Sequence, residues 1–161
     1  MTAVSSVAYG PGWRRGTGSS AASEPASRLA AHATSAYRHY AKTGFELIEQ
    51  QIAEVHATCG HQGWDGYSAL PIEAMTAQQA IRFALALPRN LPVPDVIPEP
   101  DGEIAFEWAG SGGRTISVSI GPTGKLAYAA LLTERARQNG SEQLSESIPP
   151  RVIRAIQEAT L

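Results

Sequence analysis

Three runs of alternating apolar and polar residues between positions 104 and 132 constrain the fold more than any other feature of the sequence. Period-two spacing gives a strand one buried face and one wetter face. Glycine-rich connectors at 110–113 and 121–124 suit hairpin turns. The sequence therefore predicts an antiparallel meander of three strands, with Val96-Ile97 as a short fourth strand whose flanking prolines protect an edge. The alternating apolar positions are Ile104, Phe106, Trp108, Ile116, Val118, Ile120, Leu126, Tyr128, Ala130 and Leu132.

Helical periodicity precedes and follows these strands. A first helical pattern runs from about Ser23 to Cys59 with a break at Thr43-Gly44, and a second runs from about Ile72 to Leu87. Residues 133–147 are polar and predict a loop, with a further turn or short strand as the alternative. A short final helix follows Pro149-Pro150. The apolar stripe after Gly44 is Phe45, Ile48, Ile52, Val55 and Cys59, and the apolar side of the second helix is Ala77, Ala80, Ile81, Ala84, Leu85 and Leu87.

These elements predict an α+β fold. The N-terminal helices are expected to pack on one face of a small antiparallel β-meander of three to four strands, followed by a short C-terminal helix. Residues 1–23 are small, polar and glycine-rich, so we expect a disordered arm there. Residues 24–161 are expected to form a single domain, since this length suits one hydrophobic core.

Charge is distributed unevenly along the chain. The formal net charge is −2, but residues 1–42 carry +4 and the remainder carries −6. An acidic body argues against double-stranded nucleic acid as a partner, because such surfaces need clustered Lys and Arg. No apolar run approaches the roughly 20 residues of a membrane span, so no membrane partner is expected. The single cysteine fits a reducing compartment, and we expect a bacterial cytoplasm.

The segment 63–72 places two aromatic residues, an acid and two glycines between the helical patterns. Trp64 and Tyr67 each combine a large apolar surface with a polar group, which favours them as interface anchors. Asp65 is expected to accept hydrogen bonds from backbone N–H groups and to fix an ordered corner rather than to catalyse a reaction. Whether this corner is structural or forms a binding site stays open at the level of sequence.

An acidic run lies between residues 90 and 113, where the sequence has no Lys or Arg. Within it, Glu103 and Glu107 fall on the strand face opposite Ile104 and Phe106. One interpretation is a solvated face, and the other is a docking surface for a basic protein, including Asp101. Asp101, Glu103 and Glu107 are therefore binding candidates together with Trp64, Asp65 and Tyr67.

Motifs for chemistry are sparse. His56, Cys59 and His61 lie close in sequence, with Asp65 behind them, but a closed zinc site normally needs four ligands and Cys59 continues a buried stripe. The sequence has no nucleophile elbow, phosphate loop or dinucleotide fingerprint. We therefore predict no catalytic residue, no metal and no cofactor. A small hydrolase that uses carboxylates or His56/His61 is the alternative.

The segment Gly63-Trp64-Asp65-Gly66-Tyr67, together with residues 68–72, Leu87-Pro88, 98–108 and 117–120, resembles a family of small bacterial proteins. The resemblance covers roughly residues 45–160. It implies a bacterial, soluble, single-domain protein and brings no catalytic residue, because no activity is known for that family. Its members often lie in horizontally acquired, mobile regions, which implies an antitoxin, immunity or phage–host conflict role. The resulting prediction is a non-catalytic module that binds a protein with a basic surface.

Overall fold

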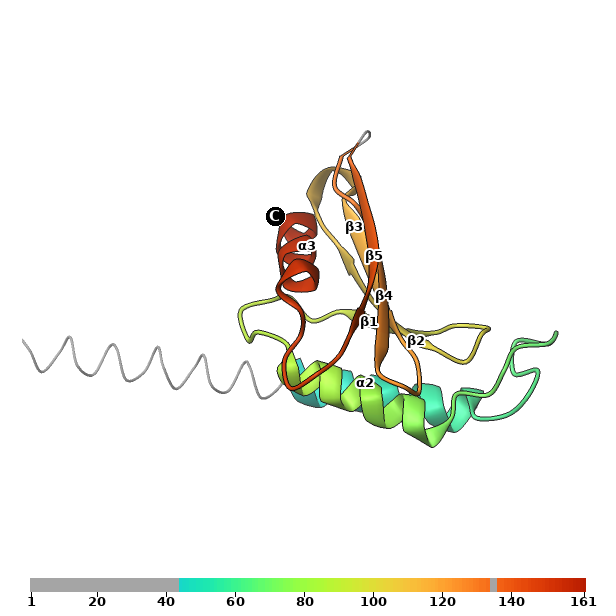
Figure 1. The fold of residues 1–161 in the computed structure, drawn as a ribbon. Coiled ribbons are helices and arrows are strands. Elements are labelled where there is room, and N and C mark those ends of the chain that lie inside the picture. The colour runs from blue at the N-terminus through green and yellow to red at the C-terminus, as the bar shows by residue number, and fades with distance from the viewer. Residues whose placement is uncertain (1–43, 134–135) are drawn as a thin grey trace, which may run out of the picture. The chain divides into compact units, whose positions relative to one another are not determined.

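The computed structural model describes residues 44–133 and 136–161, all of which belong to one compact unit, Tyr37–Leu161. The predicted arm at 1–23 and the predicted helical segment up to residue 43 lie outside the described residues. Figure 1 shows helices and a sheet in this unit. The elements are a helix at 44–59, α2 (Ala74–Ala86), β1 (Asp95–Pro98), β2 (Ile104–Ala109), a 3-10 turn (Ser111–Gly113), β3 (Thr115–Ile120), β4 (Lys125–Leu131), β5 (Arg137–Gln143) and α3 (Pro150–Thr160).

The strands form one antiparallel sheet in the order β1-β2-β3-β4-β5. This confirms the α+β class and the meander, and β1 is the short proline-flanked edge strand expected from the sequence. The sheet has one strand more than the upper end of the expected range, because β5 forms where a loop was predicted. Residues of β5 are polar and mostly exposed, so the strand carries no hydrophobic alternation by which it could be recognised.

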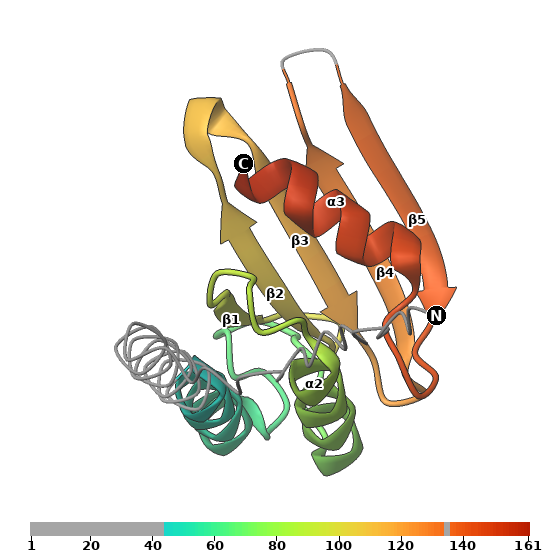
Figure 2. The ribbon, with the colours of Figure 1, turned by 90° about the vertical axis from the view of Figure 1, so that its left-hand side faces the viewer.

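Helix α3 lies across the middle of the sheet over β2, β3 and β4 (Figure 2). Pro149 precedes its first turn, and four small or branched apolar residues on one side of the helix are buried against the strands. The N-terminal helices were expected to cover this face, but α2 packs only beside β2 and β3, so the C-terminal helix shares that role. The buried residues of α3 are Val152, Ala155, Ile156 and Ala159.

The buried faces of the first two helices follow helical spacing. In the 44–59 helix the predicted stripe is confirmed, with Ile48, Ile52, Val55 and Cys59 buried. In α2 the predicted apolar side is wrong at two positions. Leu85 is 64% exposed, whereas Phe83 is fully buried and lies 4.8 Å from the ring of Phe106 between centroids. None of the described helices has both the length and the apolar character needed to cross a membrane.

The opposite face of the sheet is covered by no described helix (Figure 1). Strand pairing places the odd-numbered residues of all five strands on this side, which we call the helix-free face. Its middle is made of small side chains, so it is low and nearly flat. These small residues are Ala105, Ala109, Thr115, Ser117, Ser119, Ala127 and Ala129.

Close approach at Gly110 fixes the C-terminal end of α3. A Cβ atom at this position would collide with the carbonyl oxygen of Ala159. We expect Gly110→Ala to lower the free energy of unfolding by about 2 to 3 kcal/mol, as overpacking does. Gly112→Ala is the matched control, because Gly112 has φ +66° and open space around it. Its cost should stay near 1 kcal/mol. Urea unfolding measures both, and equal losses would contradict the close contact with α3.

Candidate functional site

Two of the three corner candidates fasten the loop between the first two described helices. The Trp64 indole Nε1 donates to the Leu70 carbonyl oxygen at 2.9 Å. The Asp65 Oδ1 accepts from the backbone N–H groups of Tyr67 at 2.9 Å and Ala69 at 3.2 Å. This is the hydrogen bonding expected of Asp65. The corner is therefore ordered by its own side chains.

The third candidate, Tyr67, faces solvent. Its side chain is 89% exposed, and Leu70 nearby is 49% exposed. No described residue accepts a hydrogen bond from the Tyr67 hydroxyl. The corner thus combines a fixed backbone with an exposed aromatic ring, which is the combination that an interface anchor requires.

The corner is joined to the turn between β1 and β2. The Leu70 N–H donates to the Pro100 carbonyl at 2.8 Å. The Thr76 hydroxyl, buried at the start of α2, donates to the Gly102 carbonyl at 3.3 Å. Gly102 itself has φ +87° and lies against the Pro71 carbonyl. These contacts hold the turn in place from outside the sheet.

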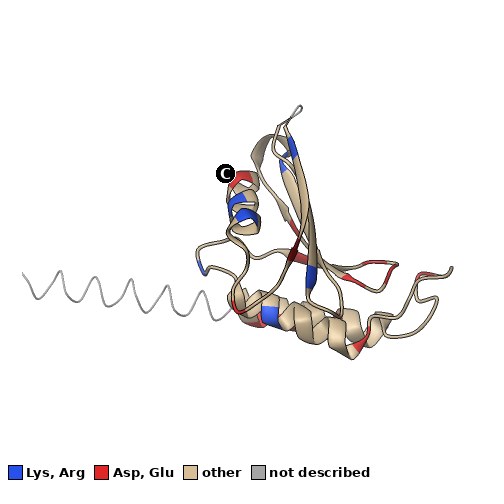
Figure 3. Cartoon of the chain, viewed as in Figure 1, with Lys and Arg blue, Asp and Glu red and all other residues tan. Residues whose placement is uncertain are grey.

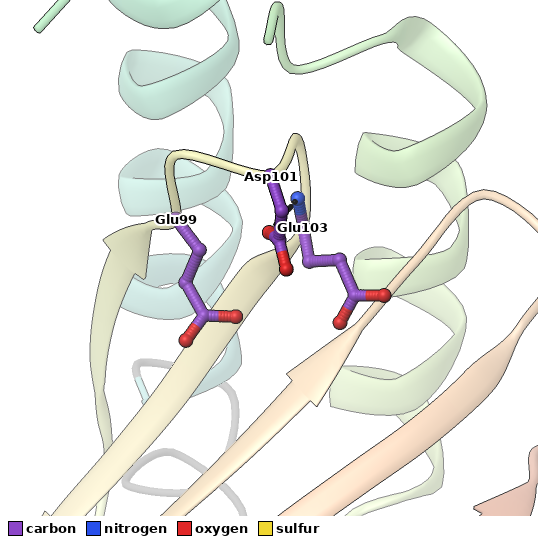
Figure 4. A group of neighbouring side chains, drawn as sticks. All are labelled: Glu99, Asp101 and Glu103. Atoms are coloured by element: carbon purple, nitrogen blue, oxygen red, sulfur yellow. Dashed lines mark hydrogen bonds between the residues drawn. The ribbon is translucent and has the colours of Figure 1, made fainter. Parts of the chain in front are cut away.

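That turn carries three carboxylates, which we call the acidic turn: Glu99, Asp101 and Glu103. One oxygen from each lies within 4.8 Å of the others, and the Glu103 N–H donates to Asp101 Oδ1 at 3.1 Å. Figure 4 shows the three side chains in front of the strands, with the N-terminal helices behind. Hard carboxylate oxygens are ligands for divalent cations and equally for Lys or Arg groups. Among residues 44–133 and 136–161, no other three potential ligand groups come this close.

The Glu103 carboxyl has a raised pKa. Partial burial is the main cause, and the charges of Asp101 and Glu99 add to it, while Lys125 opposes the shift. Arg114, the first basic residue after the acidic run, bonds Ser111 at the β2–β3 turn through its guanidinium. The charge on Glu103 is therefore only partly balanced within the described chain.

A second pair of carboxylates lies further along the same strands. Asp95 of β1 is directly opposite Glu107 of β2, on the helix-free face. Like charges placed directly opposite each other destabilise a sheet. Within the described residues neither carboxylate has an ion pair or a side-chain hydrogen bond. The acidic run of the sequence includes Asp95, but only Glu107 was selected as a binding candidate, because the strand register alone shows that the two are neighbours.

A shallow hollow of about 230 Å³ opens beside this pair. Asp95 and Glu107 line it together with Trp108, Ile116 and four small residues, among them Ser117 and Ala129. A second hollow of about 350 Å³ shares Ala129 and reaches Arg137 on β5. On the helix-free face, Asp95 and Glu107 are the charged residues of β1 and β2 that line the first hollow, and Arg137 is the charged residue that β5 contributes. In Figure 3 acidic residues mark the β1–β2 hairpin and basic residues mark the upper end of the sheet, whereas α3 carries both signs of charge.

The histidine and cysteine candidates occupy separate environments. His56 Nδ1 lies 2.9 Å from the Ile72 carbonyl oxygen, Cys59 is buried in the core, and His61 is exposed. The structure does not gather them into a ligand group. The structure instead brings Asp101 and Glu103 together with Glu99 in the acidic turn. Glu107 lies opposite Asp95, further along the same two strands.

Removal of the Asp65 carboxylate tests the role of the corner. Asp65→Ala leaves two backbone N–H groups without their acceptor, so we expect a loss of about 1 to 2 kcal/mol in the free energy of unfolding. Asp65→Asn keeps the Oδ1 acceptor and should recover most of this loss. Tyr67→Ala, the exposed control, should stay within about 0.5 kcal/mol of the wild type. Chemical denaturation distinguishes these values, and a neutral Asp65→Ala would contradict the assignment.

The raised pKa of Glu103 predicts a pH dependence of stability. Above the ordinary value of 4.5, the folded protein binds more protons at this group than the unfolded chain, so stability falls as the pH rises through this window. Glu103→Gln should therefore melt at or above the wild-type temperature near pH 7. The two proteins should converge near pH 4. A variant less stable than the wild type at neutral pH would show that the Lys125 attraction outweighs burial and repulsion.

No protein-family model, curated protein or solved structure matches this chain. The resemblance to bacterial proteins with a Gly-Trp-Asp-Gly-Tyr signature therefore stays a prediction.

Proposed function

We propose that this protein is a non-catalytic interaction module that binds a protein partner through a basic segment of that partner. The observation that carries the proposal is the Asp95–Glu107 pair, two opposed carboxylates without an ion pair among the described residues, beside a hollow on the helix-free face. The three carboxylates of the acidic turn add negative charge between this pair and the loop at residues 63–72. The partner is expected to present Arg or Lys side chains to both.

An arginine suits the hollow better than a lysine. Its planar guanidinium has several N–H donors in a fixed arrangement, so one group can contact two carboxylates at once. Like charges placed directly opposite each other are unfavourable in the free protein, and a bound cation would offset this effect. Low side chains such as Ser117 and Ala129 leave space for the guanidinium beside Glu107.

The exposed Tyr67 supplies an aromatic contact next to the charged surface. Because the corner is hydrogen-bonded to the acidic turn, a partner that spans the turn meets Tyr67 and Leu70 without any rearrangement of the backbone. Aromatic anchors contribute affinity, whereas charges contribute association rate and specificity. In this proposal Trp64 and Asp65 hold the loop in position, and they do not themselves contact the partner.

The biological setting belongs to the same proposal. The resemblance described above implies a bacterial protein of the antitoxin, immunity or phage–host conflict kind, and the single cysteine favours the cytoplasm. A small hydrolase is the alternative. It has weaker support, because His56 is engaged with a backbone carbonyl and the paired carboxylates have no nucleophile with a base beside it.

A titration of the full chain with an oligoarginine peptide, followed by NMR, tests the proposal. We expect shift changes centred on Asp95, Glu107 and the acidic turn, and weaker binding at higher salt. Asp95→Asn with Glu107→Gln should weaken binding by about tenfold, which corresponds to 1.4 kcal/mol.

Two controls sharpen the result. Glu146→Gln removes an exposed carboxylate from the loop before α3 and should leave the affinity unchanged. Calcium ions in place of the peptide distinguish a general cation site from an arginine site. Shifts spread evenly over all acidic residues, or equal weakening by Glu146→Gln, would exclude this face as the docking surface.

A further inference from the structure

The outer edge of β1 has no free backbone donor. Residues of an antiparallel edge strand alternate between bonding inward and pointing outward. The Glu99 N–H bonds inward to Glu103 at 2.9 Å, so Pro94, Val96 and Pro98 point outward. Proline has no N–H, and the Val96 N–H donates to the side chain of Gln51 at 3.0 Å. This edge is closed to another strand.

The outer edge of β5 is open. The Leu132 N–H bonds Ala136 and the Leu144 N–H bonds Gly124, both at 2.9 Å, so the even-numbered residues of β5 bond β4 and the odd-numbered residues point outward. Their N–H and C=O groups have no partner in the part of the chain that the structure describes. The strand has no proline, no lysine and an unbroken register, so it lacks the usual devices that block an edge. The outward residues are Arg137, Asn139, Ser141 and Gln143.

We propose that β5 pairs with β5 of a second copy of this chain, antiparallel about a two-fold axis at Gly140. In this register Arg137 lies opposite Gln143 of the second copy, and Asn139 lies opposite Ser141. Every outward N–H of both copies then meets an outward carbonyl. A shift by two residues in either direction would leave part of these groups unpaired, so full pairing selects the Gly140 register.

The side chains agree with this register. No like charges are opposed, unlike at Asp95 and Glu107, and Gln138 lies opposite Glu142 of the second copy. In this register a second copy matches β5 in length and opposes no like charges, which an unrelated extended peptide need not do.

The centre of the pair has room for close approach. A Cβ atom at Gly140 would lie 2.8 Å from the ring of Tyr128, so the ring occupies the space above this residue. Two glycines then meet at the axis without a side chain between them. Helix α3 lies mainly over β2, β3 and β4 (Figure 2). It reaches β5 through the bond from Gln138 Nε2 to Glu158 Oε2 at 3.2 Å, which involves side chains and leaves the outward backbone groups of β5 without a partner among the described residues. The two sheets can continue into one.

Sedimentation of the full chain over about 5 to 500 µM tests the pairing, since a dimer forms by mass action. Wild type should shift from monomer to dimer with rising concentration. Ser141→Pro removes an outward N–H without touching the ladder to β4, and it should stay monomeric. Ser141→Ala keeps that N–H and should dimerise like the wild type. Melting temperatures verify that both variants fold.

Hydrogen exchange gives a second readout that needs no variant. The amides of Asn139 and Ser141 should exchange more slowly as the concentration of wild type rises, while those of Gln138 and Gly140, already bonded to β4, should change little. A chain that stays monomeric throughout, a Ser141→Pro dimer as strong as the wild type, or exchange at Asn139 and Ser141 independent of concentration would each overturn the proposal. Oligoarginine binding reports on a different surface, so either result stands without the other.

Discussion

Burial of one face of the sheet under α3 is the constraint on which the rest of the structure depends. The helix delivers Val152, Ala155, Ile156 and Ala159 to the strands, and α2 adds Phe83 against Phe106. Hydrophobic burial on a single face is enough to hold a five-stranded meander, because the opposite face consists of small or polar side chains that water tolerates. Among the described residues, the helix-free face therefore contributes little to the hydrophobic core.

The two edges of the sheet differ in whether another element blocks them. Gln51 of the 44–59 helix covers the single outward N–H of β1, so one helix both fills the core through Ile48 and Ile52 and closes an edge. No described element does this for β5. An unblocked edge is normally a hazard for aggregation. Here its polar sequence limits non-specific pairing, because strands of low hydrophobicity gain little from burial and need a matching register.

The sequence predicts strands and helices correctly where one buried face imposes a hydrophobic periodicity, and it does not predict β5, which lacks such a face. Ile104, Phe106 and Trp108 revealed their strand because one side of it is packed, and the stripe from Ile48 to Cys59 did the same for its helix. The polar residues of β5 contain no such signal. At the candidate site, Glu103 and Glu107 were identified from charge density, but Asp95 needed the register and Lys125 needed the turn geometry. Neither relation is local in sequence.

The acidic surface places like charges close together, which is electrostatically unfavourable, although the fold holds them in position. Asp95 lies directly opposite Glu107, and Glu103 is partly buried beside two further carboxylates, which raises its pKa; both arrangements are unfavourable for charged groups. The contacts of Thr76 and Leu70 nevertheless hold the acidic turn in position, rather than letting the charges separate. A rigid arrangement of repelling charges favours a cation that fits between them, because binding relieves repulsion without the entropy of ordering a loop. In the proposed function, pre-organisation of this kind, and not the number of acidic residues, is the feature that a basic partner would recognise.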